Sequence, residues 1–386
     1  MKSKYFVVVI VGVVGLLVGM VKPMVSEIKL DVVAQQFEGV DELDRLFQKA
    51  SEFSKQGQYS KAISLSERAL VILEKAGASE TVEAAAFINF LGQQHHYQGN
   101  YTEALPLYQK SLAIRQKVLG ADHPDLATSL NNLALLYQNQ SNYTEALPLY
   151  QRSLAIYEKV LGADHPDLAT SLNNLASLYK SQGNYTEALP LYQRSLAIYE
   201  KVLGADHPDL ATSLNNLASL YEEQGNYTEA LPLYQKSLAI IQKALGGDHP
   251  FVGHSFNNLA SLSKSQGNYT EALPLYQKSL AIYEKALGAD HPFVANSLNG
   301  LASLYQEQGN YTEALPLYQR SLAIYEKVLG ADHPDLVTSL NNLASLYKSQ
   351  GNYTEALPLY QRSLAIYEKV LGADHPDLVT SLNNLA

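Results

Sequence analysis

The sequence predicts an all-α protein in which helix pairs stack into a right-handed superhelical solenoid. Two observations predict this fold class. Tyrosines return every 42 residues without insertion, and each period holds two stretches with the apolar spacing of an α-helix. A period of this length is typical of repeat proteins, whose units bury their apolar faces against their neighbours. The recurring tyrosines are Tyr59, Tyr101, Tyr143, Tyr185, Tyr227, Tyr269, Tyr311 and Tyr353.

Residues 1–22 are predicted to form an apolar helix that acts as a signal or a membrane anchor. Tyr5 to Val21 are 17 residues without a charge, and Lys2 and Lys4 precede them. As a helix this run would be about 25 Å long, against about 30 Å for the hydrocarbon core. A small-x-small cleavage pattern is missing, which favours an uncleaved anchor. The flanking positive charge predicts that the repeats lie on the extracytoplasmic side, or are exported.

Residues 23–40 are interpreted as a linker, and residues 41–386 as the repeat array. One unit, from Pro166 to Gly204, shows the pattern. Its first half, Asp167 to Gln182, places Leu168, Leu172 and Leu175 on one helical stripe, and the second half, Thr186 to Leu203, does the same.

Proline, glycine and threonine mark the helix ends of this unit. Pro166 suits a first helical position and holds His165 outside the helix. Gly183 is expected to take the left-handed conformation between the helices, Thr186 to cap the second helix, and Gly204 to end it.

The array is predicted to hold eight helix pairs and half of a ninth. The printed sequence stops at Ala386, halfway through the first helix of that ninth pair. An apolar stripe without its partner helix leads us to expect a truncated chain.

Composition narrows the function classes. The formal net charge is −10, and the charges are mixed without a basic run, so nucleic acid is not expected as a partner. The chain has no cysteine, which excludes disulfides, thiol nucleophiles and cysteine metal sites. No phosphate-binding loop, nucleophile elbow or HExxH motif occurs. We therefore predict no enzyme activity, no cofactor and no metal.

The unit resembles the tetratricopeptide repeat. The residues that carry the resemblance are Leu172, Leu175, Ala176, Tyr179, Gly183, Tyr185, Ala188, Tyr192 and Leu196. The longer period is similar to the kinesin-light-chain variant found in bacterial arrays, and the resemblance covers about residues 41–386. It implies a protein-interaction scaffold whose first helices line a concave groove for an extended peptide or a partner domain. The alternative is the regulatory half of a larger signalling or peptidase-like protein.

The same resemblance implies that asparagines of the first helices bind the peptide backbone. An amide side chain offers donors and an acceptor, so it satisfies a peptide bond whatever side chain follows. The candidate positions are Asn132, Asn174, Asn216, Asn258 and Asn342, with Asn384 after them and Asn131, Asn173 and Asn215 beside them. Gly300 interrupts the series. The alternative is that duplication copied exposed polar residues.

Specificity is expected from positions that vary between units. One such position alternates in charge and holds Lys180, Glu222, Lys264 and Lys348. Phe251, His254 and Phe256 depart from the consensus and are interpreted either as an aromatic pocket or as drift. The partners predicted are proteins or peptides, and the oligomeric state is left open.

Two recurring motifs are interpreted as structural. One histidine returns per unit, for example His165, and this spacing is too wide for one metal ion. Asn184-Tyr185-Thr186 matches a glycosylation sequon, but a tight turn and a helix cap explain the same residues.

Overall fold

A computed structural model describes residues 40–371 of the chain, and these residues fold into sixteen α-helices. The predicted apolar helix at residues 1–22 and the half unit at the end lie outside the described residues. Within residues 40–371, no helix is both long enough and apolar enough to cross a membrane.

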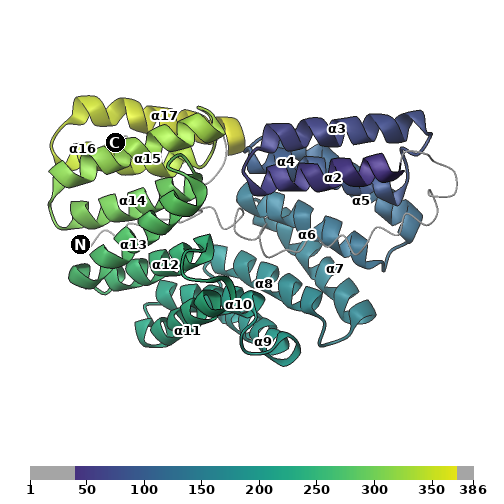
Figure 1. The fold of residues 1–386 in the computed structure, drawn as a ribbon, viewed down its shortest axis with the longest axis horizontal. Coiled ribbons are helices and arrows are strands. Elements are labelled where there is room, and N and C mark those ends of the chain that lie inside the picture. The colour runs from purple at the N-terminus through teal and green to yellow at the C-terminus, as the bar shows by residue number, and fades with distance from the viewer. Residues whose placement is uncertain (1–39, 372–386) are drawn as a thin grey trace. The chain divides into compact units, whose positions relative to one another are not determined.

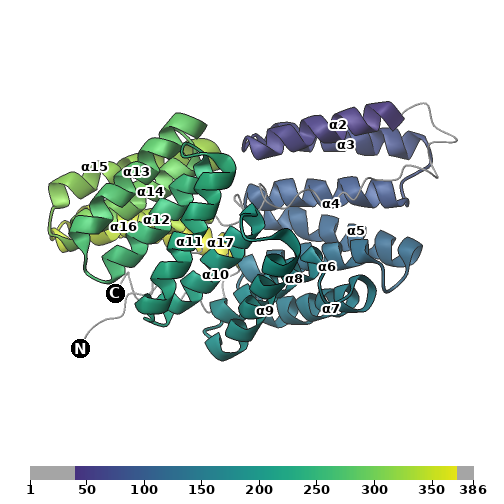
Figure 2. The same ribbon diagram turned by 60° about the horizontal axis from the view of Figure 1, so that its bottom comes forward.

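The described chain forms two compact units, and each is built mainly of antiparallel helix pairs (Figures 1 and 2). The N-terminal unit, residues 40–224, holds α2 (Val40–Lys55), α3 (Tyr59–Lys75), α4 (Val82–Tyr97), α5 (Tyr101–Leu119), α6 (Pro124–Asn139), α7 (Tyr143–Leu161), α8 (Pro166–Ser181), α9 (Tyr185–Leu203) and α10 (Pro208–Glu223). The C-terminal unit, residues 225–371, holds α11 (Tyr227–Leu245), α12 (Pro250–Ser265), α13 (Tyr269–Leu287), α14 (Pro292–Glu307), α15 (Tyr311–Leu329), α16 (Leu336–Ser349) and α17 (Tyr353–Leu371).

The start of α8 confirms the prediction from the Asp-His-Pro motif. His165 is extended, with φ −82° and ψ 137°, and Pro166 is the first helical residue. The His165 ring adds a cap, because its Nδ1 accepts the backbone N–H of Asp167 at 3.2 Å. The same histidine cap recurs at α6, α10, α12 and α14. These histidines therefore satisfy helix N-termini.

Glycine separates and ends the helices as predicted. Gly183 has φ +74° between α8 and α9, and Gly204 has φ +81° after α9. Both values lie in the left-handed region that side chains disfavour.

The predicted cap of the second helix was wrong. Asn184, not Thr186, precedes α9, and its side chain makes no capping bond. The Thr186 hydroxyl donates instead to the carboxylate of Glu187 at 2.6 Å. The N–H of Tyr185 bonds the Gly183 carbonyl at 3.0 Å, so the backbone itself makes the tight turn.

Small residues let the helices of a pair approach closely. Ala176 and Ala188, predicted at this contact, are fully buried. Ser195 of α9 is also buried, and its hydroxyl donates to the Ala169 carbonyl of α8 at 2.8 Å. Buried hydroxyls need such a partner.

The core continues from pair to pair within each unit. In the C-terminal unit one buried cluster joins Tyr283 of α13, Val294 of α14, Tyr318 of α15, Leu340 of α16 and Ile366 of α17. A single pair could not cover these side chains, so the solenoid-like arrangement predicted from the period is confirmed in each unit. The handedness of the superhelix stays a prediction.

Exposed ion pairs join the second helix of a pair to the loop that follows the preceding second helix. Lys159 pairs with Asp122 and Lys201 with Asp164, each at 2.5 Å. Their side chains are more than half exposed, so each pair contributes little to stability.

Acidification is expected to destabilise the C-terminal unit through His291. Burial lowers the pKa of His291 to about 4, whereas an unfolded histidine titrates near 6.5. Between these values the unfolded chain binds a proton that the folded chain does not. The contribution of neutral His291 is therefore complete above pH 6.5 and is lost as the pH falls towards 4. Protonation of Nδ1 also removes the acceptor for the Phe293 N–H.

Urea unfolding at pH 7 and pH 5 tests this prediction. His291→Asn keeps an acceptor for the helix cap but does not titrate, so it should lose less stability on acidification than the native chain. Equal losses in both proteins would contradict the assignment to His291.

Candidate functional site

The first helix of each pair carries a half-buried polar face. On α8 this face consists of Asp167, Thr170, Asn174 and Ser177, and it continues into exposed Ser181. The three- and four-residue steps place these side chains on one side of the helix, while Leu168, Leu172 and Leu175 on the other sides are buried. The polar face is therefore the part of a first helix that a partner can reach.

Part of the polar face is engaged internally. The Thr170 hydroxyl lies 2.7 Å from the Tyr199 hydroxyl of α9. Burial raises the pKa of the Asp167 carboxyl, and the nearby His165 partly offsets this effect. Asp167 Oδ2 lies 3.4 Å from His165 Nδ1.

The outer asparagines, by which we mean the candidate series on the polar face, are all half-buried. They are Asn132, Asn174, Asn216, Asn258 and Asn342. Asn132 donates to Asn89 Oδ1 at 3.2 Å, and Asn258 Nδ2 lies 3.3 Å from the ring nitrogen Nε2 of His254. The other three side chains make no hydrogen bond to any described residue, so their amides are free to bind a partner.

The inner asparagines precede the outer ones in sequence and lie deeper. Asn131, Asn173 and Asn299 are only 8–9% exposed, and Asn215 is half-buried. Asn173 Nδ2 donates to Ser213 Oγ of α10 at 2.9 Å, and Asn299 Nδ2 donates to Ser339 Oγ of α16 at 2.8 Å. The structure thus places Asn173 and Asn299 at the contact between consecutive first helices of one unit.

Lys180 and Lys264 also lie at this contact. Lys180 Nζ donates to Ser219 Oγ at 2.9 Å and pairs with Glu223 Oε1 at 3.0 Å. Lys264 Nζ makes the same two contacts with Ser303 and Glu307.

The remaining positions of this series differ in exposure. Glu222 is half-buried, and Lys348 is exposed without a described partner. The alternation in charge at this position therefore has a structural explanation, because Lys180 and Lys264 each pair with a glutamate of the next repeat. The sequence alone did not indicate this pairing.

We expect Lys180 and Glu223 to be coupled by about 0.5–1 kcal/mol in a double-mutant cycle of Lys180→Met and Glu223→Gln. The Lys180 side chain is only 20% exposed, which limits screening by solvent. The pair Lys201 and Asp164, with both side chains more than half exposed, is the matched control and should couple less. Equal coupling in the two pairs would contradict the prediction, and urea unfolding measures both.

At Gly300, which interrupts the outer asparagines, the Tyr276 ring occupies the space that a side chain would take. A Cβ at this position would lie 3.0 Å from Cζ of the Tyr276 ring, and closer still to Cε1. Tyr276 is 2% exposed and packs in a core with Leu301 and Leu304. Equivalent tyrosines, Tyr192 and Tyr318, lie 24 residues before Asn216 and Asn342, so the glycine is what lets the Tyr276 ring take this space.

The divergent aromatic residues do not form one cluster. Phe251 packs on the His249 ring at 4.9 Å, and Lys278 lies over the Phe256 ring at 5.5 Å. His254 takes the position of Thr170 on the polar face, and burial lowers its pKa to about 4. Whether these residues bind a partner stays a hypothesis.

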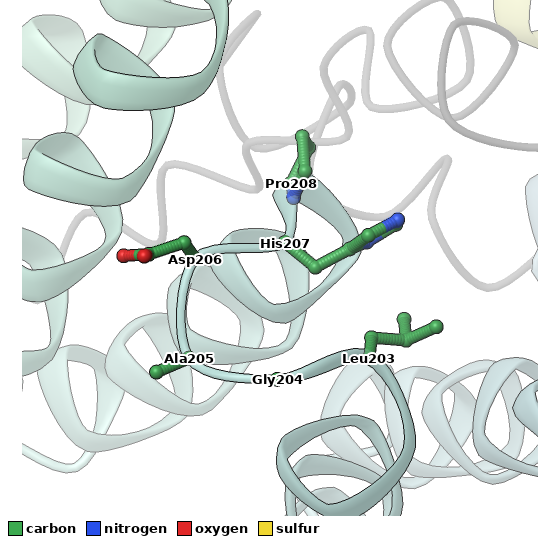
Figure 3. Close-up of a pocket in the computed structure, with 6 residues that line it drawn as sticks. All are labelled: Leu203, Gly204, Ala205, Asp206, His207 and Pro208. Carbon is green, nitrogen blue, oxygen red and sulfur yellow. The ribbon is translucent and has the colours of Figure 1, made fainter.

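The loop that joins α9 to α10 borders a shallow hollow of about 370 Å³, open to solvent (Figure 3). Asp206 and His207 point to opposite sides of this loop. Among residues 40–371, no group of three or more acidic or histidine side chains could hold a metal ion.

A family model of the tetratricopeptide repeat matches seven overlapping segments that together span residues 82–386. The first pair, α2 and α3, lies before the matched residues. No curated protein sequence matches the chain significantly.

Solved structures that are similar to this chain include three cases. Nearly identical TPR-like repeats of kinesin-light-chain type from Podosopora anserina share 34% identity over 53% of this chain and 97% of theirs, with a TM-score of 0.45. Aspartyl phosphate phosphatase F from Bacillus subtilis is 16% identical over 89% of this chain and 88% of its own, with a TM-score of 0.57.

The third case is a Rap protein complexed with competence and sporulation factor. It is 15% identical over 86% of this chain and 99% of its own, with a TM-score of 0.53. At such low identity, this structure and the phosphatase show a shared fold alone. The helix pairs, the period and the family match agree. The chain belongs to the tetratricopeptide repeat family.

Proposed function

We propose that the array is a protein-interaction scaffold that binds the backbone of an extended peptide along the polar faces of its first helices. The observation that carries this proposal is the pair of free outer amides on Asn174 and Asn216, in consecutive repeats of the N-terminal unit. Asn342 carries a free outer amide in the C-terminal unit. Each amide can donate to a peptide carbonyl and accept from a peptide N–H. Half-burial favours binding, because a hydrogen bond that is shielded from water is stronger.

The rest of the polar face suits an extended segment. Ser177 and Ser181 are small, so a peptide backbone can approach the helix closely. The ion pairs of Lys180 and Lys264 leave these cations partly neutralised. We therefore assign Lys180 and Lys264 a role in holding neighbouring repeats together beside any peptide, and Lys348 remains free to contact a peptide carboxylate.

The fold supports this class of function. Tetratricopeptide arrays generally serve as scaffolds for other proteins, and the Rap structure of similar fold holds a bound factor. We further propose, from the apolar run Tyr5 to Val21 alone, that the array is exported or held at a membrane. Fractionation of cells that express the full chain tests this location, and recovery in the soluble cytosol would contradict it.

A random-sequence peptide display library tests the binding proposal. The full chain should select peptides, and the double variant Asn174→Ala and Asn216→Ala should bind the selected peptides about tenfold or more weakly, because several hydrogen bonds are lost. The control replaces Asn142 and Asn184, which are exposed turn residues of two neighbouring repeats. Equal binding by both variants, or selection of no peptide by the native chain, would contradict the proposal.

A further inference from the structure

A buried amide oxygen without a partner recurs in the array. It is the Oδ1 atom of Asn131, Asn173, Asn215, Asn299 and Asn341. Buried polar atoms nearly always have a hydrogen-bond partner, and an orphan is costly. Its return at the same position of successive repeats requires an explanation.

The packing of consecutive first helices shows what faces this oxygen. Side chains 43 residues apart meet across this contact at several places. Asn132 donates to Asn89 at 3.2 Å, Asn139 Nδ2 lies 2.7 Å from His96 Nε2, and Lys180 pairs with Glu223 at 3.0 Å.

Asn173 lies two helical turns before Lys180, and Asn216 lies two turns before Glu223. Two turns of an α-helix bring side chains back to nearly the same face. The inner Asn173 of α8 therefore faces the outer Asn216 of α10. By the same register Asn131 faces Asn174, and Asn299 faces Asn342.

At Asn89 and Asn257 the Oδ1 atom has a hydrogen-bond partner, and the 43-residue register explains both cases. Asn89 Oδ1 is satisfied by the outer residue of the next repeat, Asn132. The residue 43 positions after Asn257 is Gly300, which has no amide, and Asn257 Oδ1 instead accepts from Ser297 Oγ at 3.5 Å. At Asn131, Asn173 and Asn299 the orphaned oxygen thus occurs where an outer asparagine of the same compact unit faces it without a hydrogen bond.

We propose that the inner asparagines are positioning residues for the outer ones. The Oδ1 atoms of Asn131, Asn173 and Asn299 each accept one N–H of the outer asparagine 43 residues on, as Asn89 does from Asn132. The Asn173 amide is already oriented for this role, because its Nδ2 donates to Ser213. The outer residue keeps its own Oδ1 and a second N–H for a peptide backbone. The functional consequence rests on the proposed peptide binding.

The hydrogen bond itself can be tested without any peptide. In the full chain labelled with ¹⁵N-asparagine, the side-chain amide of Asn216 should exchange its hydrogens about tenfold faster in Asn173→Leu than in the native protein. Asn173→Asp keeps an acceptor and should restore slow exchange, which a merely space-filling role would not. Asn257→Leu is the matched control. It should leave the hydrogen exchange of the outer amides unchanged, because the residue 43 positions after Asn257 is Gly300, which has no side-chain amide.

The two proposals fail in different ways. Equal exchange of the Asn216 amide in the native protein and in Asn173→Leu would overturn the positioning role, whatever the peptide results. Slow native exchange without any selected peptide would leave the positioning role standing and remove the peptide proposal. Should Asn173→Leu not fold, Asn131→Leu with Asn174 as the reporter gives the same test in the preceding repeat.

Discussion

Replacing Tyr192 by alanine is expected to lower the free energy of unfolding of the N-terminal unit by about 3–5 kcal/mol, as for other large aromatic residues truncated in cores. Tyr192 of α9 is 1% exposed. Its hydroxyl bonds Ser177, and burial raises its pKa. The change removes the ring between α8 and α9 and leaves Ser177 without this partner, so both a cavity and a lost hydrogen bond contribute.

Urea unfolding followed by circular dichroism measures this effect. Tyr192→Phe keeps the ring and should cost only about 1 kcal/mol for the hydroxyl. Tyr353→Ala removes a tyrosine that is 65% exposed and should change stability by less than about 0.5 kcal/mol. A loss in Tyr353→Ala as large as that in Tyr192→Ala would contradict the core assignment.

Gly300→Ala is expected to destabilise the C-terminal unit by about 1–3 kcal/mol, the usual cost of overpacking. In an exposed helix the same change would stabilise by about 1 kcal/mol, because alanine loses less chain entropy. Here the new Cβ would overlap the Tyr276 ring, and that ring is buried against its own core. The steric cost therefore outweighs the gain in helix propensity.

Gly247→Ala is the matched control in the same unit, since a Cβ there meets no atom within 4 Å. It should be neutral or slightly stabilising. A second variant, Gly300→Ala with Tyr276→Leu, should recover part of the loss because the smaller side chain vacates the space. Stabilisation by Gly300→Ala alone would show that Tyr276 does not fill this position.

The helices could be predicted because their signals are local. Pro166 fixes the start of α8, Gly183 the break after it and Gly204 the end of α9, and each acts through its own backbone. The prediction failed at Thr186, which lies inside α9 and donates its hydroxyl to the neighbouring Glu187. A capping oxygen must accept a backbone N–H from just before the helix, and sequence places the first helical residue only to within one or two positions.

The candidate site was harder to predict because it depends on the stacking of repeats. Asn173 and Asn174 are adjacent and chemically identical, yet one is buried at a helix contact and the other is half-buried and free. The roughly 100° between them on the helix decides this, and sequence periodicity does not say which of the two meets the next helix. Ser219 and Glu223, which engage Lys180, were missed for the same reason.

The contact of Lys180 with Glu223 and that of Lys264 with Glu307 recur in every second repeat. Recombination that removes two repeats would bring Lys180 opposite Glu307, so the array could change length with its charges matched. Recombination that removes one repeat would bring Lys180 opposite Ser265 and leave the cation without a carboxylate. Evolutionary change in length should therefore proceed in even steps.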